Sequence, residues 1–240
     1  MTHPPIEPIS SGATKSYMLE HDQGASFRAR LALCRGRALN AILPPGTVLD
    51  FGCGDGLLAR ALARYHRHIV AVDPHLENVT QARAFTKGHD VDVYESALET
   101  FEPPGGQRFD AIVAAGALEE VDDRLAMLVR CTNWLTDNGV IIAIASSSGR
   151  GHTHTGVRAQ PGSQADSTDY TVDRLRADFQ AAGLQVRTTG GIMFKSLPNS
   201  KMHELPPELV AAYSSLGNEV PDLAAELYVV AGRQDTGTPV

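Results

Sequence analysis

A short run of glycines and acids in the first third of the chain carries residue types well suited to binding a small molecule. It reads Asp50-Phe51-Gly52-Cys53-Gly54-Asp55-Gly56 and overlaps the end of an apolar run. Glycines at alternate positions allow a tight turn and let a ligand lie close against the backbone. A helix predicted from Leu57 onward would add exposed N–H groups and a partial positive charge.

A second acid, Asp73, ends the next apolar run. At the end of a strand in an open parallel sheet, a carboxylate can accept hydrogen bonds from both hydroxyls of a ribose. A dinucleotide site would show a glycine at the sixth position of its motif, where this chain has Leu57. A pyrophosphate would meet like charge from Asp50 and Asp55, whereas a ligand that carries an ammonium and a sulfonium would not. Electrostatics therefore favours a cationic nucleoside.

The elements that must position these residues follow from the apolar pattern. Short, almost continuously apolar runs predict buried parallel strands, and stretches of helical period lie between most of them. The predicted strands are Thr47–Phe51, Ile69–Val72, Val91–Tyr94, Ala111–Ala114, Val140–Ala145, Leu184–Thr188 and Leu227–Ala231. The predicted helices are Tyr17–Ile42, Leu57–Tyr65, Leu76–Phe85, Arg124–Leu135, Thr171–Ala182 and Pro206–Leu216. This alternation predicts an α/β fold with a Rossmann-like, doubly wound sheet, whose ligands bind at the carboxyl ends of the strands.

The domain organisation is predicted from changes in composition. Residues 1–13, which include three prolines, are expected to be a flexible arm, and residues 234–240 a tail. Residues 14–233 are expected to form one domain, with a cofactor-binding core at 46–146 and a substrate or lid region at 147–204. The region from Ser146 to Thr168 is rich in Ser, Gly, Thr and Gln, and a loop of this length is typical of a lid or binding loop.

Composition and charge exclude several classes of protein. The net charge of −7 argues against binding to nucleic acid, because such proteins need a basic surface. No run approaches the roughly 18 apolar residues of a membrane-spanning helix, and Met1–Gln23 lacks the features of a signal peptide. The 3 cysteines are far apart, which excludes a zinc site built on cysteine pairs. We therefore expect a cytoplasmic protein without a metal or membrane partner; a homodimer is left open.

The combined pattern resembles a known family. Val48 to Gly56 with Asp73 and the later Phe109-Asp110-Ala111-Ile112-Val113 is similar to the class I S-adenosylmethionine-dependent methyltransferases. The similarity is greatest to small-molecule enzymes, among them those of quinone biosynthesis and secondary metabolism. It covers Thr47 to Ala145 strongly and the last strand weakly. The resemblance implies a seven-stranded sheet whose last strand, near Leu227–Ala231, runs antiparallel.

The resemblance also implies roles in binding S-adenosylmethionine. Asp50 and Gly52 would contact its methionine part, Gly54 would pass under it, and Asp73 would hold the ribose. Relatives often place an acid after the third strand to meet the adenine amine, but this chain has Ser96 there. The remaining residues expected at the cofactor are Pro74, Ser96, the backbone of Ala97, and Ala115 at the end of the fourth strand.

Candidates for catalysis and substrate binding come from the edge of the sheet and the polar regions. Relatives often have a histidine where this chain has Glu120, so the general base is expected to be Glu120, His152 or His154. Residues expected to contact the substrate are Tyr17, His21, Glu119, Arg158, Tyr170 and Lys195. The acids, histidines and hydroxyl groups after the fifth strand suit a polar substrate better than a quinone.

The predicted function is therefore transfer of a methyl group from S-adenosylmethionine to an oxygen or nitrogen of a small polar metabolite, leaving S-adenosylhomocysteine. Among cofactor, cell-surface sugar and antibiotic synthesis, the resemblance favours antibiotic synthesis. Two alternatives remain open: an NAD(P)-dependent oxidoreductase, and a non-catalytic module that binds S-adenosylmethionine.

Overall fold

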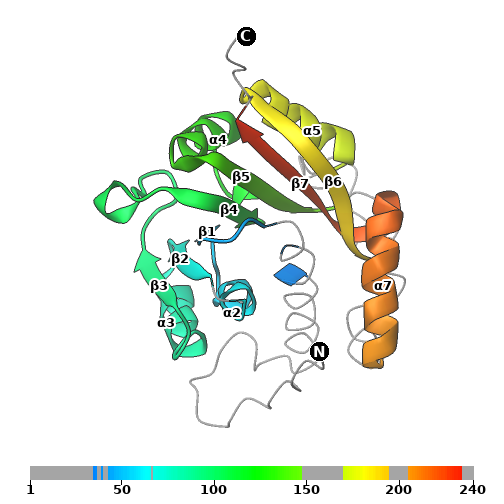
Figure 1. Ribbon diagram of the computed structural model, residues 1–240, viewed down its shortest axis with the longest axis horizontal. Coiled ribbons are helices and arrows are strands. Elements are labelled where there is room, and N and C mark those ends of the chain that lie inside the picture. Colours follow the sequence, from blue (N-terminus) through cyan, green and yellow to red (C-terminus); the bar gives the residue numbers. More distant parts are fainter. Residues whose placement is uncertain are drawn as a thin grey trace, which may run out of the picture.

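All seven strands belong to one sheet with helices on both faces (Figure 1). The computed structural model describes residues 35–36, 39, 43–65, 67–147, 170–194 and 205–233. The strands are β1 (Thr47–Phe51), β2 (His68–Asp73), β3 (Val91–Glu95), β4 (Phe109–Ala115), β5 (Leu135–Ser146), β6 (Leu184–Phe194) and β7 (Ala224–Arg233). The helices are α2 (Leu57–Ala63), α3 (Leu76–Phe85), α4 (Arg124–Asn133), α5 (Val172–Ala181) and α7 (Pro207–Glu219). The described residues also form three short 3₁₀ turns: η1 (Pro104–Gly106), η2 (Ala117–Glu119) and η4 (Pro221–Leu223).

The sheet has the order β3-β2-β1-β4-β5-β7-β6. β7 pairs antiparallel with both β5 and β6, while the other pairs are parallel. The prediction of a mostly parallel sheet with an antiparallel last strand is therefore confirmed. The strand order reverses between β1 and β4, and this is where an open α/β sheet binds its ligands.

Alternate side chains of each strand fill two separate hydrophobic layers. Leu49 of β1 belongs to the layer covered by α4 and α5, and its neighbour Val48 belongs to the layer covered by α2, α3 and α7. Figure 1 shows these two groups of helices on opposite sides of the sheet. Because the central strands are apolar on both faces, the sheet is buried between these two layers. The carboxyl ends of its strands are thus carried by a packed core.

Several predicted helix boundaries agree with the capping geometry. The Thr171 side chain accepts a hydrogen bond from the Arg174 N–H at 3.1 Å and so caps α5. Gly183, at φ 74°, follows the end of α5 as expected. Other boundaries differ from the prediction. α2 ends at Ala63 instead of Tyr65. α4 ends at Asn133, and Leu135 instead begins β5, where it pairs with Phe109 of β4.

β6 is longer than predicted. The predicted strand ended at Thr188, before Gly190 and Gly191, because glycine weakens a strand. In the structure β6 continues through both glycines to Phe194. A Cβ on Gly191 would lie 2.3 Å from the Gly217 carbonyl oxygen of α7, so the glycine is needed for close packing between helix and strand.

Candidate functional site

The three glycines of the loop after β1 have two different roles. All three have positive φ, between 53° and 81°, which favours glycine. A Cβ on Gly52 would lie 2.6 Å from the Ala117 Cβ, and one on Gly56 would lie 2.8 Å from the Ala82 Cα of α3. A Cβ on Gly54 would meet nothing within 4 Å. Gly52 and Gly56 therefore serve packing, and Gly54 leaves space above the backbone for a ligand.

Asp73 ties the end of β2 to this loop. Its Oδ2 accepts a hydrogen bond from the Gly54 N–H at 2.9 Å. Its Oδ1 accepts from the His75 N–H at 2.9 Å and from the Asn78 side-chain amide at 3.0 Å. The carboxylate is thereby fixed in orientation at the carboxyl edge, where the sequence predicted a ribose acid. Asn78, one turn into α3, was not foreseen as its partner.

Asp50 is a buried carboxyl with an unused oxygen. The residue is 1% exposed, and its Oδ2 has no hydrogen-bond partner among the described residues. Burial raises the pKa of Asp50 to about 7; Arg35 opposes this shift, and Asp73 and Asp55 add to it. A buried acceptor without a donor is costly unless a ligand completes it. An ammonium group supplies both the missing donor and the positive charge, so the site fits the amino-acid end of S-adenosylmethionine.

Arg35 and Glu226 form an ion pair that the sequence analysis missed. The Arg35 Nε donates to the Glu226 Oε2 at 2.9 Å, and an Arg35 Nη also contacts the second carboxylate oxygen. Glu226 is 8% exposed on β7, beside Ser146 of β5 and Ile192 of β6. An acid inside an apolar strand was the available signal, but the predicted strand began one residue later.

The other expected cofactor residues lie on the carboxyl edge. Pro74 is half-buried directly after Asp73, and Ala115 is half-buried at the end of β4. The Ser96 N–H donates to the Asp73 carbonyl at 3.1 Å, which places the turn after β3 beside the ribose acid. Ala97 is exposed at this turn. The structure thus brings the predicted cofactor residues to neighbouring strand ends.

Residues predicted for catalysis are only partly described. Glu120 is exposed and follows η2, the short turn after β4. The backbone of Glu119 lies in the same turn. The other predicted residues, Tyr17, His21, His152, His154, Arg158 and Lys195, lie outside the described residues, as do most of the predicted helix Tyr17–Ile42, the arm at 1–13 and the tail at 234–240.

Tyr170 is placed in the hydrophobic core. It is 2% exposed, and the guanidinium carbons of Arg124 and Arg174 lie 5.4 and 5.1 Å from its ring centroid. It also forms a parallel bridge to Ser147. Contact of Tyr170 with a substrate stays a prediction, and its described contacts hold the start of α5 against the sheet.

Metal and thiol chemistry find no support in the described part of the chain. No group of three or more His, Cys, Asp and Glu side chains there could hold a metal ion. Burial raises the pKa of the Cys53 thiol, so Cys53 is not a reactive thiolate. Among these same residues, no helix is long and apolar enough to cross a membrane.

Comparison with known proteins gives consistent results. Residues 49–141 match a methyltransferase domain family. A ubiquinone biosynthesis O-methyltransferase of Xanthomonas campestris is 35% identical over 108 residues, which is 43% of this chain and 44% of that protein. The chain thus spans less than half the length of that relative. A protein of the same name from Rhodopseudomonas palustris is 26% identical over 72% of this chain and 71% of its own length.

Solved structures share the fold. The magnesium protoporphyrin IX methyltransferase of Synechocystis, solved with bound S-adenosylhomocysteine, has a TM-score of 0.58 at 15% identity. The likeness covers 93% of this chain and 90% of that one. It therefore extends beyond the glycine motif to the strands after β5.

Proposed function

We propose that this chain is a class I S-adenosylmethionine-dependent methyltransferase, which transfers the cofactor's methyl group to a small polar acceptor. The observation that carries the proposal is the buried Asp50 oxygen, which has no partner among the described residues and lies at the point where the strand order reverses. Beside it lie a loop with open space over Gly54 and a fixed acid, Asp73.

The chain's own residues would act mainly by binding and orientation. S-Adenosylmethionine, when bound, supplies a methyl group already activated by its sulfonium. Asp50 would accept from the ammonium group, Asp73 would accept from the ribose hydroxyls, and the backbone at Gly54 would lie against the ligand. Aligning an acceptor lone pair behind the methyl group contributes much of the rate enhancement in such a reaction.

The acceptor would be an oxygen or nitrogen, and we favour an oxygen. The named relatives are O-methyltransferases of ubiquinone biosynthesis. A hydroxyl acceptor needs a base during attack, and we assign this role to Glu120, His152 or His154. Glu120 supports the assignment by its exposed place at the end of the short turn that follows β4. Synthesis of an antibiotic or related metabolite remains our proposal for the pathway.

The cofactor site can be tested with two glycines of equal strain. Gly54 and Gly88 both have positive φ, and a Cβ on either meets no atom within 4 Å. Alanine at either position should therefore cost about 1 kcal/mol of stability from backbone strain. Only Gly54→Ala adds a methyl group where the ligand would lie. By calorimetry, Gly54→Ala should weaken S-adenosylhomocysteine binding at least about tenfold, which is 1.4 kcal/mol.

Gly88→Ala should bind S-adenosylhomocysteine as the unaltered protein does. Equal affinity in both variants would show that the ligand does not lie over Gly54. No binding by the unaltered protein would overturn the proposed function itself.

A further inference from the structure

In the turn after β3, several hydrogen-bond donors share one backbone carbonyl oxygen, that of Ala97. The Ala97 carbonyl accepts from the Thr100 N–H at 3.2 Å and from the Phe101 N–H at 2.9 Å. It also accepts from the Ser96 hydroxyl at 3.2 Å and the Thr100 hydroxyl at 3.3 Å. A Ser96 hydroxyl that donates to this carbonyl keeps its own lone pairs available as acceptors. The turn therefore presents an acceptor beside the ribose acid, Asp73.

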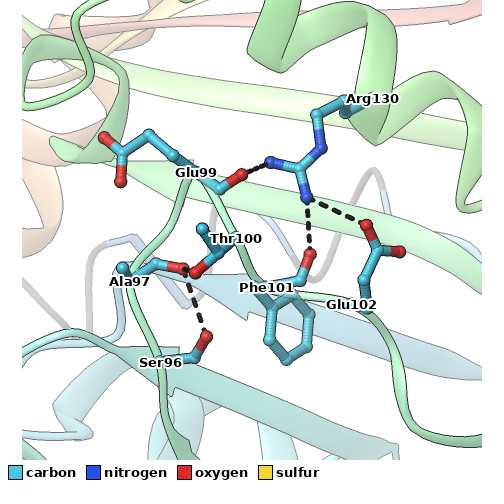
Figure 2. A network of polar contacts seen from close by, with 7 residues as sticks. All are labelled: Ser96, Ala97, Glu99, Thr100, Phe101, Glu102 and Arg130. Atoms are coloured by element: carbon cyan, nitrogen blue, oxygen red, sulfur yellow. Dashed lines mark hydrogen bonds and ion pairs between the residues drawn. The ribbon is translucent and has the colours of Figure 1, made fainter.

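The far side of the same turn is held by Arg130 of α4, as Figure 2 shows. One Arg130 Nη donates to the Glu99 carbonyl, and the other donates to the Phe101 carbonyl at 2.7 Å. The second Nη also contacts the Glu102 carboxylate at 3.1 Å. The guanidinium carbon lies 5.2 Å from the Trp134 ring centroid. Arg130 thus joins α4 to the backbone carbonyls of Glu99 and Phe101, which lie in a segment that forms neither strand nor helix.

The carbonyl contacts matter more than the ion pair. The Glu102 side chain is 74% exposed, and an exposed ion pair contributes little. A charged donor to a backbone carbonyl is stronger, and the fixed fork of the guanidinium suits two carbonyls at once. Phe101 also packs edge-on against Trp134, with ring centroids 5.7 Å apart. The turn is therefore anchored at its backbone by Arg130 and at Phe101 by Trp134.

We propose that Arg130 is a positioning residue for recognition of the cofactor's base: it fixes the Ser96–Phe101 turn so that the Ser96 hydroxyl accepts from the adenine amino group. This inference rests on the proposed function. Hypoxanthine carries a carbonyl oxygen in place of that amino group, so the Ser96 hydroxyl could pair with it only by turning its proton away from the Ala97 carbonyl. The turn should consequently prefer adenine, and the preference should depend on Arg130.

The test compares two ligands, S-adenosylhomocysteine and its hypoxanthine counterpart, S-inosylhomocysteine, by calorimetry. The unaltered protein should prefer adenine by about tenfold, the value of one hydrogen bond of about 1.4 kcal/mol. Arg130→Met should reduce this preference to near unity, mainly by weakening binding of the adenine ligand. Arg130→Lys, which keeps the charge but lacks the fork, should retain only part of it.

Two controls separate positioning from general damage. Glu102→Gln removes only the exposed ion pair and should leave the preference unchanged. Ser96→Ala removes the accepting hydroxyl and the part of the preference that depends on it, so adding Arg130→Met should reduce the preference no further. A thermal unfolding midpoint for each variant shows whether it is folded.

The outcomes are distinguishable. A preference that survives in Arg130→Met overturns the inference, as does an equal loss of affinity for both ligands. An unaltered protein that binds both ligands equally well also overturns it, while leaving the proposed function standing. If the unaltered protein binds neither ligand, the proposed function fails first.

Discussion

At the scale of single residues, the proposed role of Asp50 would link its protonation to ligand binding. Burial raises its pKa to about 7, and the carboxylate form is the one that accepts from an ammonium group. Below pH 7 a growing fraction of the free protein carries a protonated Asp50, which must lose its proton before the ligand binds. Affinity for S-adenosylhomocysteine should therefore rise about tenfold per pH unit below 7 and level off above it. Calorimetry from pH 5.5 to 8.5 measures this profile.

A substitution of Arg35 tests whether Asp50 is the group that titrates. Its positive charge lowers the pKa of Asp50, so Arg35→Met should shift the rise in affinity to higher pH. Asp50→Asn should remove the rise altogether. A profile that is the same in all three proteins would show that Asp50 does not titrate in this range.

At the scale of elements, the contact between β6 and α7 depends on glycine. A Cβ on Gly191 would lie 2.3 Å from the Gly217 carbonyl oxygen and 2.5 Å from the Ala224 Cβ. Gly191→Ala should therefore lower the free energy of unfolding by about 1–3 kcal/mol, the usual cost of overpacking. Urea denaturation measures the loss. Thr188→Val, on an exposed part of the same strand, should change stability by less than about 0.5 kcal/mol.

These glycines also show where sequence reasoning reached its limit. The loop from Asp50 to Gly56 was predictable because its residues are contiguous and follow an apolar strand. Gly190 and Gly191 lay beyond the end of the predicted strand. Gly191 is needed for close packing against α7, and only the fold brings α7 against β6. The strands before β6 were located within a few residues for the same reason as the loop, since their signal is local.

Side chains that act across the fold were harder to foresee. Arg35 and Glu226 are 191 residues apart, and nothing local to Arg35 distinguishes it from the other arginines nearby. Arg130 reads as an ordinary helix residue, because its partners are backbone carbonyls that leave no trace in residue types. Sequence therefore predicts the ligand-facing loop better than the contacts that hold it.

At the scale of the whole molecule, the ligand should stabilise the fold. A ligand that binds only the folded protein, at about one hundred times its dissociation constant, adds about 2.7 kcal/mol. For a domain of this size each kcal/mol raises the melting temperature by roughly 2–4 °C. S-Adenosylhomocysteine should thus raise it by about 5–11 °C.

NADH at the same concentration is the matched control and should leave the melting temperature unchanged. It lacks the ammonium group that Asp50 requires, and its pyrophosphate would meet the acids of the loop. A rise with NADH and none with S-adenosylhomocysteine would favour the oxidoreductase alternative.

The position of β7 in the sheet affects the order in which the strands can pair during synthesis on the ribosome. β7 is the last strand in sequence, yet it lies between β5 and β6, and β6 has no other neighbour in the sheet. While the ribosome is still synthesising the chain, β1 to β5 can pair as they emerge, but β6 must wait. Glu226 arrives on the same strand, so the buried partner of Arg35 is also absent until translation of this segment is finished. Nascent chains stalled before residue 224 should consequently expose the apolar edge of β5 to chaperones.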